Sequence, residues 1–145
     1  MRLAVLLAAT VLAAHAAETG RVFVYSTSPM QDHPWMTVSC DGENVAAVKR
    51  GTYFVISVPA GQHTIASKDA IPTSVDVRSG EDVFVRVGWR EREGSRPISI
   101  FMKAAPEQAA REMKLLGYIE PKKIVSPSVL KADPREPVPV KLKRR

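Results

Sequence analysis

The residue types best suited to metal chemistry gather between residues 30 and 36 of this chain. Met30, His33 and Met36 recur at intervals of three, with Trp35 beside the last of them. Thioether and imidazole groups are soft ligands that suit copper(I), but three such ligands in one loop make a weak site. Pro34 favours a loop over a helix. We therefore predict an exposed loop whose Met and Trp side chains pack on a domain edge, and we keep a periplasmic copper binder as an alternative function.

A second group of residues offers anion-binding chemistry. Trp89, Arg90, Arg92 and Arg96 lie in the segment 89–97, which has the composition of a charged hairpin loop. Three guanidinium groups beside an indole ring form a candidate ligand patch, with Trp89 as a stacking platform. Alternating charge signs are more typical of a solvated loop. We expect the solvated loop and keep the patch as a candidate site.

Two single residues are also candidates for chemistry. His63 follows the turn Pro59-Ala60-Gly61 and begins a strand. The simplest role for its ring is a bond to a backbone group of that turn, with ligand binding or proton transfer as the alternative. Cys40 is the sole cysteine, which excludes an intramolecular disulfide. It shares a strand face with Met36 and Val38, so we predict a small buried side chain rather than a reactive thiol.

Common enzyme signatures are missing from the sequence. It contains no G-x-S-x-G, H-E-x-x-H, Walker-type glycine loop or C-x-x-C. The carboxylates are scattered in turns, which suits solubility better than paired acid–base work. We predict that the protein is not an enzyme and uses neither a cofactor nor a catalytic metal.

Short strands must position these candidates, because the apolar periodicity of the chain is mostly two. Turn signals at Asp41-Gly42, Arg50-Gly51 and 59–61 separate the runs. This spacing predicts an all-β fold over residues 17–103, a small antiparallel β-sandwich of the immunoglobulin or prealbumin type with about seven strands. The residues predicted to form its core are Val24, Val38, Phe54, Ile56, Val58, Val85, Val87 and Ile100.

One C-terminal helix is predicted within residues 104–120. Pro106 suits its first position and Gly117 its stop, so the helix should run from Pro106 to about Leu116. Ala109, Met113 and Leu116 form one narrow apolar stripe, which predicts a helix packed on the sheet as a lid.

The N-terminus predicts export. Arg2 and the apolar run 3–14 precede Ala14 and Ala16 in the A-x-A positions of a cleavage site, so residues 1–16 are a predicted signal peptide with the cut before Ala17. The alternative, a short membrane anchor, is disfavoured because a spanning helix needs roughly 20 apolar residues. We expect a periplasmic or extracellular monomer without a transmembrane span after cleavage.

The C-terminal segment, residues 121–145, differs from the rest of the chain. It holds five prolines, eight Lys or Arg and two acidic residues, whereas residues 17–120 hold 12 positive and 13 negative side chains. Such a composition predicts a disordered basic tail. Anionic cell-wall polymer or membrane headgroups are the expected partners, and nucleic acid is not, because the chain is predicted to be exported and no aromatic residue interleaves the charges. The candidate contact residues are Lys122, Lys123, Lys141, Lys143, Arg144 and Arg145.

Residues 21–103 resemble domain of unknown function 2846, a family of small exported bacterial domains. The motifs that carry the resemblance are Val22-Phe23-Val24-Tyr25, Asp41-Gly42, Gly51-Thr52-Tyr53-Phe54, Pro59-Ala60-Gly61-Gln62-His63 and the strand 83–90. The resemblance implies a β-sandwich in the cell envelope and assigns no reaction.

Three functions follow as hypotheses. The first is a non-enzymatic envelope module held near an anionic surface by the cationic tail. The second is a small-molecule or saccharide binding module that uses the aromatic side chains Trp35, Trp89, Tyr25 or Tyr53. The copper binder described above is the third, and an enzyme is disfavoured.

Overall fold

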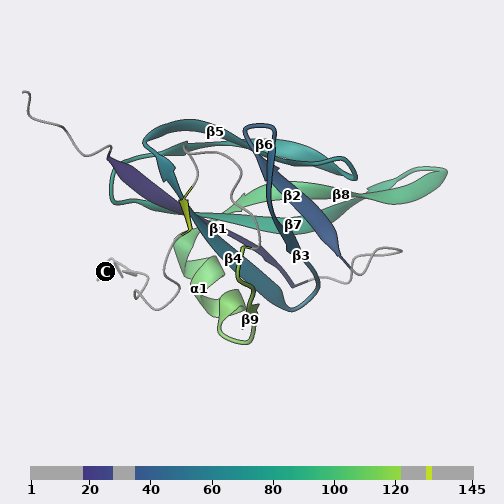
Figure 1. Ribbon diagram of the computed structural model, residues 1–145. Coiled ribbons are helices and arrows are strands. Elements are labelled where there is room, and N and C mark those ends of the chain that lie inside the picture. Colours follow the sequence, from purple (N-terminus) through teal and green to yellow (C-terminus); the bar gives the residue numbers. More distant parts are fainter. Residues whose placement is uncertain (1–17, 28–34, 122–129, 132–145) are drawn as a thin grey trace, which may run out of the picture.

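Ten strands and one helix form the part of the chain that the computed structural model describes, residues 18–27, 35–121 and 130–131 (Figure 1). The main strands are β1 (Thr19–Ser26), β2 (Met36–Cys40), β3 (Glu43–Val48), β4 (Thr52–Pro59), β5 (Gly61–Ser67), β6 (Ala70–Val77), β7 (Asp82–Arg92) and β8 (Ser95–Ala104). Helix α1 (Pro106–Met113) and the short strands β9 (Gly117–Tyr118) and β10 (Leu130–Lys131) follow. The predicted all-β class is confirmed.

The strands join in one curled sheet with the order β10-β4-β1-β7-β8-β6-β5-β2-β3, and β9 also pairs with β4. Within the described residues, strand pairing links its two halves, β4-β1-β7-β8 and β6-β5-β2-β3, only where Ala70 and Ile71 of β6 pair with Ser99 and Ile100 of β8. Because the strands form one continuous sheet, the predicted sandwich with about seven strands is not confirmed.

The sheet is mixed and not purely antiparallel, which corrects the sequence prediction. β1 pairs with β7 in parallel, as do β6 with β8 and β4 with β9. Arg21 and Asp82 fasten the start of the β1–β7 pair through a fork of two bonds, Nε to Oδ1 at 2.7 Å and Nη2 to Oδ2 at 2.9 Å. Local periodicity specifies which side chains share a face but not the direction of a distant partner strand, so this feature was missed.

The inner face of the curled sheet forms the main core. Both halves contribute to it, for example Val24 of β1 and Val38 of β2, which belong to strands that do not pair. All eight residues predicted to form the core are buried: Val24, Val38, Phe54, Ile56, Val58, Val85, Val87 and Ile100. Seven of them lie in the main core, which confirms the predicted faces of their strands, but Ile100 does not, because on β8 the neighbouring Phe101 packs there instead.

A second, smaller core lies on the outer face of β1, β4 and β7, where α1 covers the sheet (Figure 1). Phe23, Tyr25, Val55 and Phe84 pack there against Ala109 of the helix. The predicted helical lid is confirmed, but α1 ends at Met113 and not at Leu116. The chain turns there because the Gly117 N–H donates to the Gly51 carbonyl and starts β9 on the edge of β4.

An ion pair also ties the helix to the sheet. Arg86 of β7 and Glu112 of α1 approach to 3.2 Å between Nε and Oε2, and both side chains are mostly buried. The phenol of Tyr25 lies beside them. Burial, followed by the Glu112 carboxylate, raises the pKa of Tyr25 above its usual range.

Part of the segment predicted to be disordered contacts the domain. Pro121 is buried, and Leu130 and Lys131 pair antiparallel with Ser57 and Ile56 of β4. The remainder of residues 121–145 lies outside the described residues, as do residues 1–17. None of the helices within the described ranges has the length and apolar character needed to cross a bilayer.

Candidate functional site

The turn between β2 and β3 forms one wall of the first candidate site. Asp41 and Gly42 have φ angles of 51° and 85°, the left-handed pair that a two-residue type I′ hairpin turn requires. The predicted Asp-Gly turn is thereby confirmed. Asp41 is then fixed on β5, because its N–H donates to the Thr64 carbonyl at 2.9 Å and its Oδ1 accepts the Thr64 N–H at 2.8 Å.

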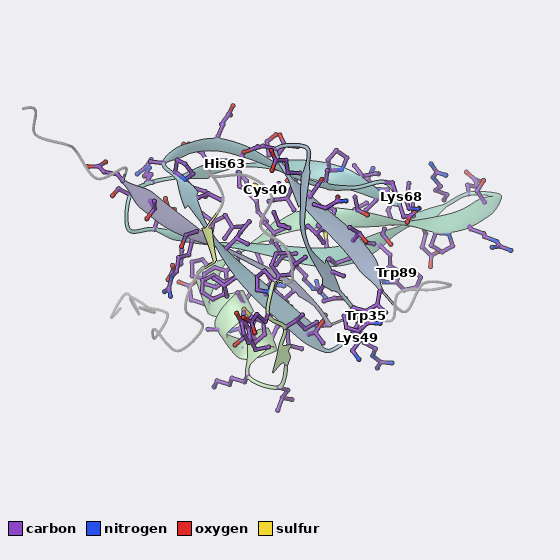
Figure 2. The ribbon with its side chains drawn as sticks, in the orientation of Figure 1. Trp35, Cys40, Lys49, His63, Lys68 and Trp89 are labelled. Atoms are coloured by element: carbon purple, nitrogen blue, oxygen red, sulfur yellow. The ribbon has the colours of Figure 1, made fainter. Side chains whose placement is uncertain are left out.

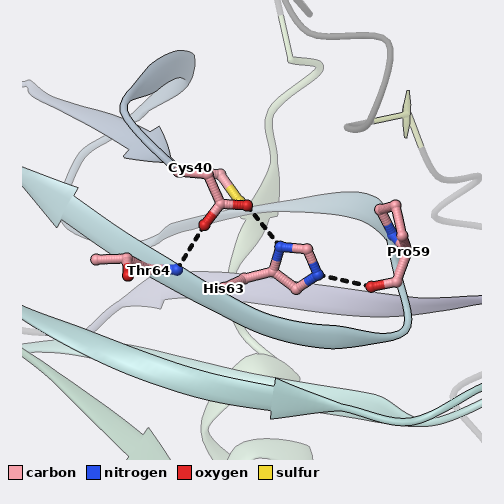
Figure 3. A network of polar contacts seen from close by, with 5 residues as sticks. Cys40, Pro59, His63 and Thr64 are labelled. Atoms are coloured by element: carbon pink, nitrogen blue, oxygen red, sulfur yellow. Dashed lines mark hydrogen bonds and ion pairs between the residues drawn. The ribbon is translucent and has the colours of Figure 1, made fainter.

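His63 links this turn to the end of β4. Its Nε2 lies 2.6 Å from the carbonyl oxygen of Pro59 and its Nδ1 lies 2.6 Å from Oδ2 of Asp41 (Figure 3). Both ring nitrogens are therefore engaged, one with a backbone carbonyl and one with a side-chain carboxyl group. The predicted bond from His63 to a backbone group of the turn is confirmed.

Cys40 completes the cluster from the end of β2. Its side chain is fully buried in the main core, as predicted, and its Sγ lies 3.8 Å from Oδ2 of Asp41. Burial, and then the Asp41 carboxylate, raises the pKa of the thiol to about 12. The thiol donates to Asp41 rather than to His63, so the three residues do not form the nucleophile–base pair of a cysteine hydrolase.

The Asp41 carboxylate sits between the other two groups. Partial burial would raise the pKa of Asp41, but the hydrogen bonds from His63 and Thr64 outweigh it and lower that pKa below its usual value. One ligand atom each from Cys40, Asp41 and His63 lies within 4.8 Å of the others. The sequence did not predict that these three residues lie together. The features that hint at it are an Asp-Gly turn directly after Cys40 and a histidine shortly after the turn at residues 59–61.

The second candidate site lies at the opposite end of β2. Trp35, just before β2, is 47% exposed, and the Lys49 ammonium stands 4.7 Å from the centre of its ring. Trp89 of β7 is 45% exposed, because β7 continues past the edge of the core. Figure 2 shows Trp35, Lys49 and Trp89 toward the same end of the sheet.

Strand pairing supports this placement. Met36 pairs with Val48 at the start of β2, and Ser26 at the end of β1 pairs with both Thr52 and Val87. Trp35 directly precedes Met36, and Trp89 follows Val87 along β7. Both tryptophans therefore lie at the same end of the sheet. We call Trp35, Lys49 and Trp89 the tryptophan end.

The predicted arginine patch lies on the β7–β8 hairpin, which projects from the body of the domain (Figure 1). Arg90, Arg92 and Arg96 are exposed, as predicted, but they belong to strands β7 and β8, and the predicted loop is reduced to a turn at residues 93–94. Trp89 and Arg90 are consecutive strand residues and so face opposite sides of the hairpin. The structure therefore does not bring Trp89 and all three arginines together on one face.

Of the two tyrosines considered as ligand contacts, Tyr25 is fully buried beneath α1. This burial corrects its inclusion among the candidate binding aromatics. Tyr53 is partly buried and packs beside the same helix, with its ring 5.6 Å from that of Tyr118.

Of the predicted copper ligands, Met36 is buried in the main core, which does not favour a role as a loop ligand. Met30 and His33 lie outside the described residues. The same holds for the predicted surface contacts Lys122, Lys123, Lys141, Lys143, Arg144 and Arg145. No protein-family model, curated protein or solved structure matches this chain.

Proposed function

We propose that this protein is an exported, non-enzymatic module of the cell envelope, held near anionic cell-wall polymer or membrane headgroups by its cationic C-terminal segment. The observation that carries the proposal is the distribution of charge. Residues 121–145 hold eight Lys or Arg and two acidic residues, whereas residues 17–120 hold 12 positive and 13 negative side chains. The net charge of +6 therefore resides in the C-terminal segment.

Electrostatic attraction of this size is sufficient for reversible association. Each Lys or Arg near an anionic surface contributes on the order of 1 kcal/mol before screening. The attraction must weaken with salt, because the Debye length falls from about 10 Å at 0.1 M to about 3 Å at 1 M. A folded binding pocket is not required for this kind of association.

The test removes charge without shortening the chain. The variant K141Q/K143Q/R144Q/R145Q neutralises four cations beyond β10, and its matched control R50Q/K68Q/R90Q/R92Q neutralises four exposed cations of the domain. Both proteins are sedimented with phosphatidylglycerol vesicles and with cell-wall sacculi at low and high salt. We expect the first variant to bind at least about tenfold more weakly than the wild type, given the per-charge contribution above.

The control variant should bind nearly as the wild type does. If the control loses binding and the C-terminal variant keeps it, the domain surface and not the C-terminal segment holds the protein. Binding that persists at high salt would equally contradict an electrostatic tether.

A second candidate function, capture of a saccharide or other small molecule, is favoured by the tryptophan end. Trp35 and Trp89 are the two exposed tryptophans of the described residues, and indole rings offer flat apolar faces for sugar rings. The cation of Lys49 lies beside one of these rings. Trp35→Ala and Trp89→Ala should each abolish binding of cell-wall glycan fragments measured by calorimetry, with Arg92→Gln as the control. Unchanged binding in both tryptophan variants would exclude this function.

For the fold type, the immunoglobulin- or prealbumin-like sandwich remains part of the proposal. It is supported by the two halves of the sheet, which share one core and are linked by only two residue pairs. We also propose that the chain is related to domain of unknown function 2846. Its motif residues occupy the β2–β3 turn and the β4–β5 corner of this structure.

A further inference from the structure

We propose that Cys40, Asp41 and His63 form a binding site for a divalent zinc-class metal ion, independent of the surface association proposed above. One ligand atom from each residue lies within 4.8 Å of the other two. Thiolate, imidazole and carboxylate are the three protein ligands of zinc, and a set of three leaves a fourth position for water. Asp41 is exposed, so that position lies toward solvent.

Two of the three ligand separations require only small side-chain adjustments, and the third, from Sγ of Cys40 to a ring nitrogen of His63, lies within 4.8 Å. Zinc bonds of about 2.3 Å to sulfur and about 2.0–2.2 Å to nitrogen and oxygen place tetrahedral ligand atoms about 3.3–3.6 Å apart. The present separations are 2.6 Å from Nδ1 of His63 to Oδ2 of Asp41 and 3.8 Å from Sγ of Cys40 to the same oxygen. The first contact must open by roughly 0.7 Å and the second must close slightly.

The groups around the three ligands are those that a metal site needs. A metal-bound histidine usually donates its other ring N–H to a carbonyl or carboxylate, and Nε2 of His63 already meets the Pro59 carbonyl at 2.6 Å. This bond leaves Nδ1 directed at the cluster. A ligating carboxylate is in turn held by hydrogen bonds, and Oδ1 of Asp41 accepts the Thr64 N–H. The contact between Nε2 of His63 and the Pro59 carbonyl and the contact between Oδ1 of Asp41 and the Thr64 N–H can both persist when a metal ion binds.

The ligand set points to a doubly charged ion. A divalent ion that binds the Asp41 carboxylate, a neutral His63 imidazole and the Cys40 thiolate gives a cluster with no net charge, and its binding displaces the thiol proton of Cys40. Binding of metal with release of protons is the expected behaviour of such ligands. The buried thiolate selects against Mg²⁺ and Ca²⁺, which prefer oxygen ligands.

The experiment uses the full chain, first stripped with a chelator. Zn²⁺ is titrated by calorimetry in two buffers of different ionisation enthalpy, and Co²⁺ is added separately as a spectroscopic probe. We expect one Zn²⁺ per chain, release of protons, and a thiolate-to-cobalt charge-transfer band in the near ultraviolet. Zn²⁺ should also raise the melting temperature, because it binds only the folded state.

Three variants assign the site. Cys40→Ser removes the thiolate, His63→Gln removes the imidazole, and Asp41→Asn removes the carboxylate while keeping an Asn-Gly pair that suits the type I′ turn. Each should weaken Zn²⁺ binding by at least about tenfold to a hundredfold, the loss typical of removing even an outer-shell partner. Cys40→Ser must also abolish the charge-transfer band.

Matched controls separate this site from other metal binding and from misfolding. Asp76→Asn removes an exposed carboxylate from β6, and His33→Gln removes the ring from the predicted copper loop. Both should bind Zn²⁺ as the wild type does. Circular dichroism of Asp41→Asn, the least disruptive variant, should match the wild type. Absence of the charge-transfer band, equal binding by folded Asp41→Asn, or loss of binding in His33→Gln would each overturn the proposal.

Discussion

Nδ1 of His63 lies 2.6 Å from Oδ2 of Asp41, and this contact fastens the β2–β3 turn to the first residues of β5. The same ring holds the Pro59 carbonyl, so one side chain joins the ends of β2, β4 and β5. β2 and β5 already pair with each other, but β4 and β5 are not neighbours in the sheet, so the ring adds a polar link between the end of β4 and the β2–β5 pair. The corner should therefore respond to changes in any of its polar members.

Asp41→Asn should change how stability depends on acid. The folded-state pKa of Asp41 is lowered, so its contribution is fully present above the unfolded pKa of about 3.9 and is lost as pH falls below it. In chelator-treated protein, we expect the variant to be less stable by about 1–2 kcal/mol near pH 5. The difference should shrink toward zero near pH 2. Urea unfolding across this range measures it, and a constant difference would contradict the assignment.

Cys40 should be inert toward alkylation in the folded protein. Burial and the Asp41 carboxylate raise its pKa to about 12, and the thiolate is the reacting species. Iodoacetamide should modify the native protein far more slowly at pH 8 than the urea-unfolded chain, as followed by mass spectrometry. Asp41→Asn removes the charge beside the sulfur and should shift the rise of the labelling rate to lower pH. Rapid labelling of native wild type would show that the thiol is accessible.

Gly20→Ala and Gly88→Ala should differ sharply in stability although both glycines are buried in strands. A Cβ on Gly20 would lie 2.7 Å and 2.8 Å from the carbonyl oxygens of Arg78 and Glu81, which belong to the backbone. A Cβ on Gly88 would meet the end of the flexible Met102 side chain. We expect a loss of about 2–3 kcal/mol for the first change and less than about 1 kcal/mol for the second, by denaturant unfolding. Equal losses would contradict the close approach at Gly20.

Arg86→Met should destabilise the attachment of α1. It leaves the Glu112 carboxylate between helix and sheet without its cation, at a cost of about 1–2 kcal/mol, less than a fully buried pair because both groups retain some exposure. The double change Arg86→Met with Glu112→Leu should recover most of this loss. If the losses simply add in the double-mutant cycle, the two side chains do not interact.

The core and the turns were predictable from the sequence because they are local properties. Alternation along Phe54, Ile56 and Val58 specified a buried face, and Asp41-Gly42 specified its turn. The same strand also contained a signal that was not used. Val55, between two buried neighbours, makes the run continuously apolar, which is typical of a strand covered on both faces.

The candidate sites were less predictable, because they depend on contacts between distant segments. Cys40 was correctly predicted to be buried, and His63 was correctly predicted to bond a backbone group of a turn. Their shared contact with Asp41 was not predicted, because Asp41 and His63 are 22 residues apart in the sequence. Likewise, Trp89 continues the alternation of the buried residues Val85 and Val87, yet it is 45% exposed. Its exposure follows from the length of β7 relative to the core, which periodicity does not report.

The fork between Arg21 and Asp82 joins residues 61 positions apart, and the strand that carries Arg21 lies between β4 and β7 in the finished sheet. During folding, β1 can form an antiparallel pair with β4 early, but its other edge has to wait until the chain beyond residue 82 has been made. Closing so large a loop is entropically costly and slows folding. Until that closure, β1 exposes an apolar, unpaired edge, so this interval is when the chain is most open to mispairing with other chains.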